Sequence, residues 1–287
     1  MVKSVYVGLG LSEDKYKELG SIGANHLIVA GQNINKKRWK MLQKTGADLT
    51  ISVDSFEQGA CPLDPKAKVR LEKIIGKALK WRPKEIWLDH FRFDGHWEAI
   101  SGKEILGLHK QCQWCRGKDR AQEIAKLAAW AKDLIPSGPV SDSRESLTRG
   151  EALRAGGRKV KVGYFAVPFK KEEVSSLVAD LGQDHRLLGK VFDTSSPMLY
   201  HRMIKKPVSY ISEYIKYLYG LTNKPVFPII QIKEMPDDLP DMLKKSEFFQ
   251  AFSEAAKSPS SGVSIFYWKH AIEKDKVDWI KEAFSST

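Results

Sequence analysis

The chain is poor in cysteine and has no long apolar run. It contains 3 cysteines in 287 residues, a small and odd number that argues against a framework of disulfides. No stretch of about 18 or more apolar residues is present, so a membrane-spanning helix is not expected. Residues 1–8 enter an apolar run directly and lack the regions of a signal peptide. A cytoplasmic protein is expected, and a secreted domain trimmed of its signal is the alternative.

The sequence also lacks the signatures of several cofactor and metal enzymes. There is no GxGxxG or Walker-type loop, so a nucleotide cofactor is disfavoured. The first apolar run, Val5–Gly10, has no His-x-His pair, and no CxxxCxxC run exists for a radical cluster. Lys161 and Lys233 lie near later runs, but neither has the apolar setting of a Schiff-base lysine. No cofactor is therefore expected.

Positive charge exceeds negative charge along the chain. Lysine and arginine number 47 against 35 aspartate and glutamate, a formal net charge of +12. The excess is spread over segments such as Lys36–Lys40 and Lys66–Lys73, as on a solvated outer ring of helices. It is also compatible with a polyanion, either nucleic acid or an acidic polysaccharide. Because no nucleic-acid module is recognisable, a carbohydrate partner, neutral or acidic, is favoured. The oligomeric state is left open.

Short apolar runs alternate with segments of helical spacing. In Pro65–Trp81, for example, Val69, Ile74, Ala78 and Trp81 are expected on one side, after an Asp64 N-cap. Such alternation predicts parallel strands joined by helical crossovers, and eight units in this length match a (β/α)8 TIM barrel. An open doubly wound sheet is the alternative. The eight runs are Ser4–Leu9, His26–Ala30, Asp48–Val53, Glu85–His90, Lys159–Pro168, Val191–Tyr200, Pro225–Ile232 and Gly262–Trp268.

We expect one domain over residues 1–287, with a long insertion at about 92–158 after the fourth strand. An insertion of this length is expected to wall the barrel mouth. It contains Cys112-x-x-Cys115 with His109 nearby, and Cys61 could approach them only through space. A structural zinc site needs four ligands. Reduced thiols are therefore favoured over zinc, and no metal is assigned.

Active sites of such barrels lie at the carboxyl ends of the strands. Asp89 ends an apolar strand, where an ionised carboxylate is costly without a task or a partner. It is the first candidate for catalysis, and the alternative is an ion pair with Arg92 that shapes the loop. Glycosidic cleavage needs a second carboxylate, for which Glu234 and Asp54 are the candidates. Side chains expected to bind the sugar or hold the carboxylates are Arg92, Trp97, Tyr164, Tyr200, His201, Gln231, Tyr267 and Trp268.

Four strand motifs resemble those of a group of glycosyl hydrolase-like (β/α)8 barrels, which are distantly similar to chitinase-like and alpha-amylase-like barrels. Leu88–Asp94 resembles the pattern L-D-Y-I-R-F-P, and Asp193–Tyr200 resembles D-x-x-S-P-M-x-Y. Pro228–Gln231 resembles P-W-L-Q, and Gly262–Trp268 resembles G-x-x-x-W. The resemblance implies cleavage of O-glycosidic bonds in a poly- or oligosaccharide. A non-catalytic carbohydrate- or polyanion-binding barrel is the alternative.

The chain departs from these patterns at three positions. His90 stands where the group has Tyr, and Asp94 where it has Pro. Phe91 occupies the position of an acid in the chitinase-like pattern D-x-D-x-E. Chemistry that uses the acetamido group of the substrate as nucleophile is therefore not expected. Asp193 matches its motif but begins its strand, so we expect it at the barrel floor in a structural role.

Overall fold

The computed structural model describes residues 1–8, 12–31, 34–56, 59–95, 112–135, 159–174, 176–235, 238 and 241–286. The strands are β1 (Val2–Val7), β2 (His26–Ala30), β3 (Asp48–Asp54), β4 (Glu85–Asp89), β5 (Lys161–Ala166), β6 (Thr194–Pro197), β7 (Ile229–Gln231) and β8 (Gly262–Phe266). The helices are α1 (Glu13–Glu18), η1 (Leu19–Ser21, a 3-10 helix), α2 (Lys36–Gln43), α3 (Pro65–Leu79), α4 (Arg120–Asp133), α5 (Ser176–Leu181), α6 (His185–Val191), α7 (Tyr210–Thr222), α8 (Lys245–Ala256), α9 (Trp268–Glu273) and α10 (Val277–Ser285).

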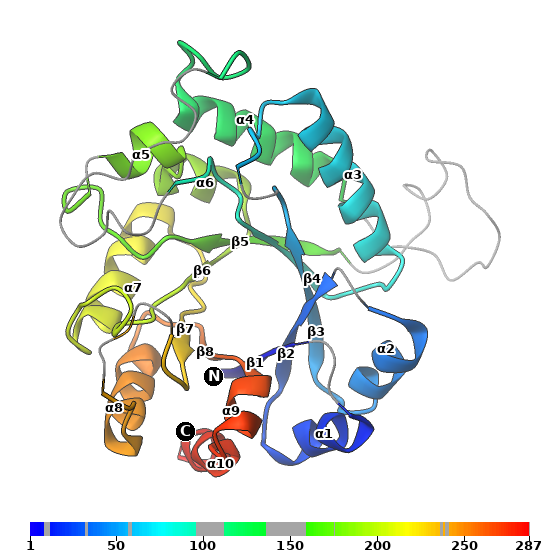
Figure 1. Cartoon of the computed structure of the whole chain (residues 1–287), viewed down its shortest axis with the longest axis vertical. Coiled ribbons are helices and arrows are strands. Elements are labelled where there is room, and N and C mark those ends of the chain that lie inside the picture. The colour runs from blue at the N-terminus through cyan, green and yellow to red at the C-terminus, as the bar shows by residue number, and fades with distance from the viewer. Residues whose placement is uncertain are drawn as a thin grey trace.

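The strands form a closed ring. Within the described ranges, eight parallel strands pair in the order β6-β5-β4-β3-β2-β1-β8-β7. The bridges Ser195–Val226 and Met198–Ile229 join the two ends of this order. Figure 1 shows the ring of strands with the helices around it. The predicted (β/α)8 barrel is confirmed, and an open sheet is excluded.

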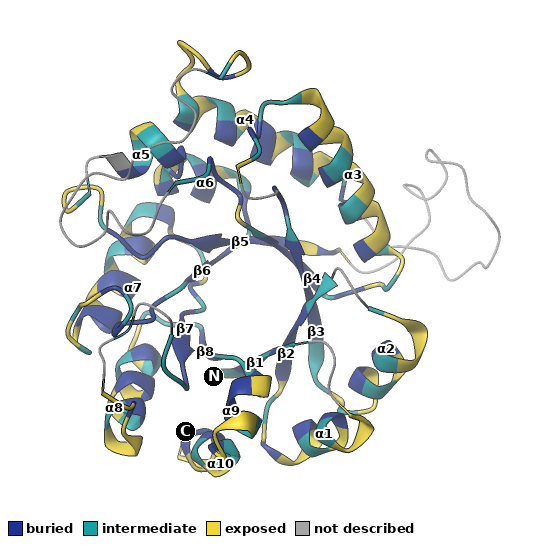
Figure 2. Ribbon diagram, viewed as in Figure 1, coloured by how far each residue is buried: buried dark blue, intermediate teal, exposed yellow. Residues whose placement is uncertain are grey.

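Alternate side chains of the strands fill two separate hydrophobic clusters. The inner cluster lies inside the ring and is dominated by large side chains. On β4, Trp87 belongs to this inner cluster, whereas Ile86 and Leu88 belong to the outer cluster between strands and helices. Figure 2 shows buried residues along the strands and exposed residues on the outer sides of the helices. The members of the inner cluster are Ile28, Trp87, Phe165, Tyr200 and Ile229.

Helix α3 illustrates how local sequence sets an element and which face it buries. Asp64 is its N-cap and accepts a hydrogen bond from the Lys66 backbone N–H at 2.8 Å, and Pro65 occupies the first turn. The buried face consists of Ala67, Leu71, Ile75 and Ala78. Val69, expected on that face, is 67% exposed. The start of the helix and the burial of Ala78 are as predicted, and Ile74 and Trp81 are partly buried against the outer cluster. The prediction is wrong for Val69, because the centre of the buried face runs through Leu71 and Ile75.

The predicted insertion after the fourth strand is only partly described. Residues 96–111 and 136–158 lie outside the described residues, and α4 lies between these two gaps. Asp119 is the N-cap of α4 and accepts a hydrogen bond from the Gln122 N–H. In the part of the chain that the structure describes, no helix combines the length and the apolar content needed to cross a membrane.

The floor of the barrel holds a buried histidine between two hydroxyl groups. His26 Nδ1 lies 2.9 Å from Ser4 Oγ, and its Nε2 lies 2.7 Å from Thr50 Oγ1. Burial lowers the pKa of His26 from its usual value to about 4. Asp193 also lies at the strand beginnings, where it accepts the Val162 N–H and pairs with Lys132. The imidazole of His26 is therefore neutral in the folded protein.

We expect His26 to make folding sensitive to acid. Because its pKa is depressed, the unfolded chain binds more protons than the folded chain between the two pKa values. This stabilisation is fully present above about pH 6.5 and is lost toward pH 4, by up to about 1.4 kcal/mol per pH unit. Urea unfolding of wild type and His26→Gln from pH 7 to 4.5 checks this. The difference in free energy of unfolding between the two proteins should decrease as the pH falls. A difference that stays constant with pH contradicts the prediction.

Candidate active site

Two aspartates lie side by side at the carboxyl ends of neighbouring strands. Asp54 and Asp89 end β3 and β4 and are paired across the two strands. Side chains alternate along a strand, and Trp87, two residues before Asp89, belongs to the inner cluster. Ser52, two residues before Asp54, is paired with Trp87, so both aspartates lie on the face of the sheet that lines the barrel interior. Their side chains are 31% and 24% exposed. Both carboxylates therefore lie at the barrel mouth, where they are partly open to solvent.

His90 lies between these two carboxylates. Its backbone is left-handed, with φ of 48°, and its imidazole Nδ1 is 3.0 Å from Asp54 Oδ1 and 3.9 Å from Asp89 Oδ1. Its backbone N–H donates to Asp89 Oδ1 at 2.8 Å. The hydrogen bond to Asp54 raises the pKa of His90, against burial, and Asp89 adds to the increase. The imidazole is thus the shared neighbour of both acids and is biased toward its charged form.

Asp89 is biased toward its protonated form. Burial raises the pKa of Asp89 above its ordinary value, and the negative charge of Asp54 adds to that effect. His90 and the buried Arg92 oppose the increase without cancelling it. Arg92 Nη1 donates to the Phe93 carbonyl at 3.1 Å and lies 4.0 Å from Asp94. A carboxyl group with a raised pKa next to a second carboxylate is suited to donating a proton.

Two aromatic hydroxyl groups lie near the acids. Tyr6 donates to Ser52 Oγ at 3.2 Å, and Tyr200 is 6% exposed. Burial raises the pKa of both phenols, and the charge of Asp89 raises it further, so both remain protonated. Phe266 lies beside both rings, at 5.3 Å from each. The mouth therefore combines carboxyl, imidazole and phenol groups with a half-buried aromatic surface.

Sequence reasoning missed Tyr6, Ser52 and His90. A signal was available for Ser52, because Thr50, Ser52 and Asp54 are the alternate positions of one strand. The same alternation would have selected Tyr6 on β1. No sequence signal identified His90, because its place between the acids depends on a positive φ.

Glu234 and His201 are bound to partners on later parts of the chain. Glu234 Oε1 accepts the Leu243 backbone N–H at 2.6 Å and lies 3.6 Å from the buried Lys276. His201 Nε2 lies 2.9 Å from Glu247 on α8. His201 thereby connects the segment after β6 to α8, and Glu234 connects the segment after β7 to the residues that precede α8 and α10. The structure thus does not bring either of them to the Asp54–Asp89 pair.

Gln231, Tyr267 and Trp268, which were expected at the mouth, lie in three different environments. Gln231 ends β7 and donates through Nε2 to Lys233 O at 3.1 Å and to Asp238 at 2.5 Å. Trp268 is fully buried and donates to the Lys15 carbonyl at 3.0 Å, which places it between α9 and α1. Tyr267 is half-buried and packs so closely on Gly8 that a Cβ there would lie 2.7 Å from its ring. Trp97 and His109 lie outside the described residues.

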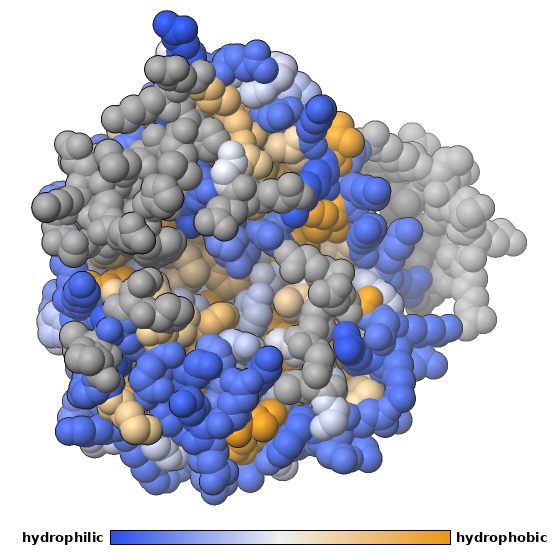
Figure 3. All heavy atoms as spheres, viewed as in Figure 1, coloured by the Kyte–Doolittle hydropathy of each residue, from blue (hydrophilic) through white to orange (hydrophobic). Residues whose placement is uncertain are grey.

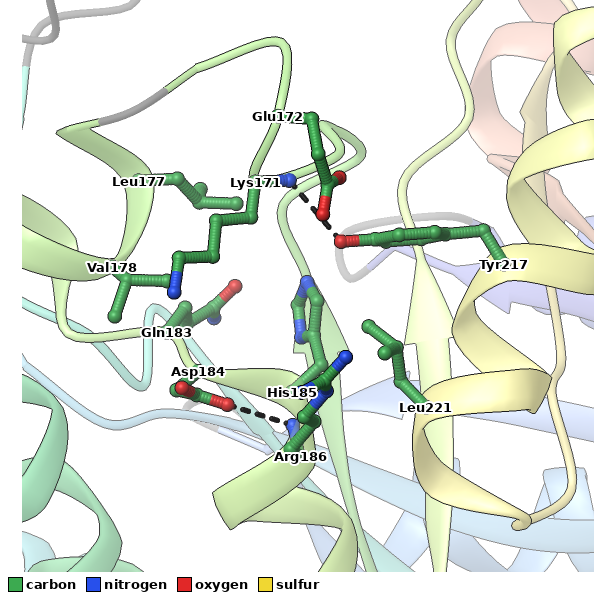
Figure 4. A pocket seen from close by; sticks show the side chains of 10 residues that line it. All are labelled: Lys171, Glu172, Leu177, Val178, Gln183, Asp184, His185, Arg186, Tyr217 and Leu221. Atoms are coloured by element: carbon green, nitrogen blue, oxygen red, sulfur yellow. Dashed lines mark hydrogen bonds between the residues drawn. The ribbon is translucent and has the colours of Figure 1, made fainter.

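Tyr164 faces the helices and not the barrel interior. Its hydroxyl lies 3.0 Å from His185 Nδ1, and its ring stacks on Phe192 at 5.0 Å. Above His185 is a surface hollow of about 310 Å3 between α5, α6 and α7 (Figure 4). Its Tyr217 hydroxyl accepts the Lys171 N–H at 3.2 Å. This hollow is separate from the two acids at the mouth.

The molecular surface around the barrel is largely hydrophilic. Figure 3 shows hydrophilic side chains over the outer helices, including α1, α2 and α10, with smaller apolar areas between them. This agrees with the excess of lysine and arginine spread along the chain.

Comparisons with known proteins show similarity in fold. No family model matches the sequence, and no curated protein matches it. Among solved structures, a GH113 β-1,4-mannanase is 10% identical with a TM-score of 0.56, covering 100% of this chain and 99% of that one. The β-1,3-glucanosyltransferase of Rhizomucor miehei is 8% identical with a TM-score of 0.54, covering 92% and 86%.

A third similar structure belongs to a longer protein. The GH2 β-galacturonidase of Eisenbergiella tayi is 11% identical with a TM-score of 0.55, covering 100% of this chain and 51% of that one. The chain thus spans about half the length of that enzyme. The structural neighbours are carbohydrate-active enzymes with the same barrel, and at this level of identity the likeness establishes the fold.

Proposed function

We propose that this protein is a glycoside hydrolase that cleaves O-glycosidic bonds with Asp89 as proton donor and Asp54 as its partner. The observation that carries the proposal is the Asp54–His90–Asp89 group at the barrel mouth. The raised pKa of Asp89, caused first by burial, suits it to protonate a leaving oxygen. The similar barrels of the mannanase and the glucanosyltransferase support this choice of chemistry.

The spacing of the two acids favours retention of configuration. Because His90 Nδ1 lies 3.0 Å from an Asp54 oxygen and 3.9 Å from an Asp89 oxygen, those oxygens are separated by at most the sum of these distances. That limit reaches only the lower edge of the ~6.5–9.5 Å spacing of inverting enzymes and includes the ~5–5.5 Å spacing of retaining ones. We therefore assign a nucleophilic role to Asp54.

The reaction then has two steps. Asp89 donates its proton to the glycosidic oxygen while an Asp54 oxygen bonds to the anomeric carbon and the bond to the leaving oxygen breaks. In the second step, Asp89 takes a proton from water, whose oxygen attacks the anomeric carbon and releases Asp54. His90 holds Asp54 in place, and the protonated hydroxyl of Tyr200 is available as a hydrogen-bond donor near Asp89. The half-buried Phe266 offers a flat apolar surface for a sugar ring.

The stereochemistry of the product tests this assignment. We expect wild type to hydrolyse members of a panel of neutral and uronic-acid glycosides and to release the sugar with retained anomeric configuration. Proton NMR of the first product, recorded before mutarotation, measures this outcome. Inversion would exclude Asp54 as nucleophile. Binding without turnover across the panel would instead support a non-catalytic carbohydrate-binding barrel.

A further inference from the structure

Three cysteines that are far apart in the sequence meet in space. Cys61 follows β3, whereas Cys112 and Cys115 precede α4. Their three Sγ atoms all lie within 4.8 Å of one another. Cys61 and Cys115 are 7% and 3% exposed, and Cys112 is half-buried. Among the described residues, no further His, Cys, Asp or Glu joins this group.

Hydrogen-bonded turns hold the backbone around the cysteines. Cys112 and Cys115 lie in one turn, in which the Arg116 N–H donates to the Cys112 carbonyl at 2.9 Å. The Cys115 N–H also donates to the Cys112 carbonyl at 3.3 Å. On the other segment, the Asp64 N–H donates to the Cys61 carbonyl at 3.0 Å. Each cysteine segment is therefore held in a hydrogen-bonded turn, which fixes where its sulfur atoms lie.

We propose that Cys61, Cys112 and Cys115 bind one Zn²⁺ ion, with one oxygen or nitrogen donor completing the tetrahedron. A Zn–S bond of ~2.3 Å in a tetrahedral site separates two sulfurs by about 3.8 Å, so the observed limit requires at most about 1 Å of closure. A disulfide would join only two of the three thiols and leave the third without a partner of its own kind. The convergence of all three therefore favours a metal.

The ion would tie together the segments that carry the two acids of the mouth. Asp54 ends β3, and the segment between β3 and α3 contains Cys61. Asp89 ends β4, and the segment between β4 and α4 contains Cys112 and Cys115. These connections already touch where the Gly59 N–H donates to Asp94 at 2.6 Å and where Phe56 packs on Phe91. A metal bound to the three cysteines would add a further link between the same two segments. The zinc proposal rests on the cysteine geometry and does not depend on the proposed hydrolysis.

Metal content of the full chain tests the proposal. We expect wild type, purified without chelator and dialysed, to hold one zinc ion per chain by mass spectrometry of the metals. Replacement by Co²⁺ should give thiolate-to-metal charge-transfer absorption, and X-ray absorption should show three sulfur neighbours and one lighter neighbour. Removal of the metal with a chelator should lower the melting temperature, and Zn²⁺ alone should restore it.

Two variants separate a ligand role from a general effect on folding. Cys112→Ser alters the half-buried thiol, and its zinc affinity should fall by more than the ~10–100-fold that loss of an outer-shell partner costs. Asp119→Asn alters the same segment but keeps all thiols and an acceptor for Gln122, so it should keep its zinc. Metal-free wild type that takes up no Zn²⁺, iron in place of zinc, or a disulfide between two of the cysteines would each overturn the proposal.

Discussion

Asp89→Asn is expected to abolish most hydrolysis while leaving the protein folded. The amide has the shape of the carboxyl group and can still accept the His90 N–H, so the melting temperature should stay near that of wild type. It cannot donate the catalytic proton, and acid–base assistance alone is worth ~10²–10⁴-fold in rate. Measuring kcat and melting temperature on the same sample checks both parts. In wild type, activity should also fall as the pH rises through the raised pKa of Asp89.

Glu234→Gln is the matched control for this experiment. Its side chain is 24% exposed, as that of Asp89 is, and it lies three residues beyond the carboxyl end of β7. Because Glu234 is bonded to the Leu243 N–H and lies near Lys276, its loss should lower stability and change kcat little. Full activity of folded Asp89→Asn, or equal rate losses in the two variants, would count against the assigned role of Asp89.

Trp268→Ala is expected to cost stability and not sugar affinity. Its side chain is fully buried between α9 and α1, and its indole N–H donates to the Lys15 carbonyl. Truncating a buried Trp to Ala costs about 3–5 kcal/mol. Urea unfolding measures this loss, with Tyr219→Ala as control, because Tyr219 is 38% exposed and should change stability by no more than about 0.5 kcal/mol.

A sugar-stacking role for Trp268 leads to the opposite result. The folded fraction of Trp268→Ala would then show a raised KM with little loss of stability. Trp268→Phe keeps a buried aromatic ring, so it should fold even if Trp268→Ala is too unstable to fold. It therefore permits the KM measurement in either case.

The barrel could be predicted from the sequence because short, largely apolar runs alternate with segments of helical spacing. The same reasoning placed Asp54 and Asp89 at strand ends, which the pairing of β3 with β4 bears out. It extended the last strand to Trp268, but β8 ends at Phe266 and Tyr267 is the N-cap of α9. Periodicity does not separate a strand end from the first turn of a helix when the residues are apolar and aromatic.

The remaining site features depend on contacts between distant parts of the chain. Glu234 is held near Lys276, which follows α8, β8 and α9, so no local pattern could give the direction of its side chain. His90 reaches Asp54 through a positive φ, which is uncommon in any residue other than glycine. Cys61 meets Cys112 and Cys115 only after two barrel connections have packed together. Sequence alone locates candidate groups on strands but not their partners across loops.

The division of the core into an inner and an outer cluster has a consequence for how the protein could be engineered. On β4, Trp87 belongs to one cluster and Ile86 and Leu88 belong to the other, with the backbone sheet between them. Substitutions on opposite sides share few neighbours, and effects of well-separated substitutions usually add. Stability gained beneath the helices can therefore be combined with altered side chains inside the ring. Because the strands separate the two clusters, we expect that stability can be raised from the outer side while the side chains inside the ring are changed for function.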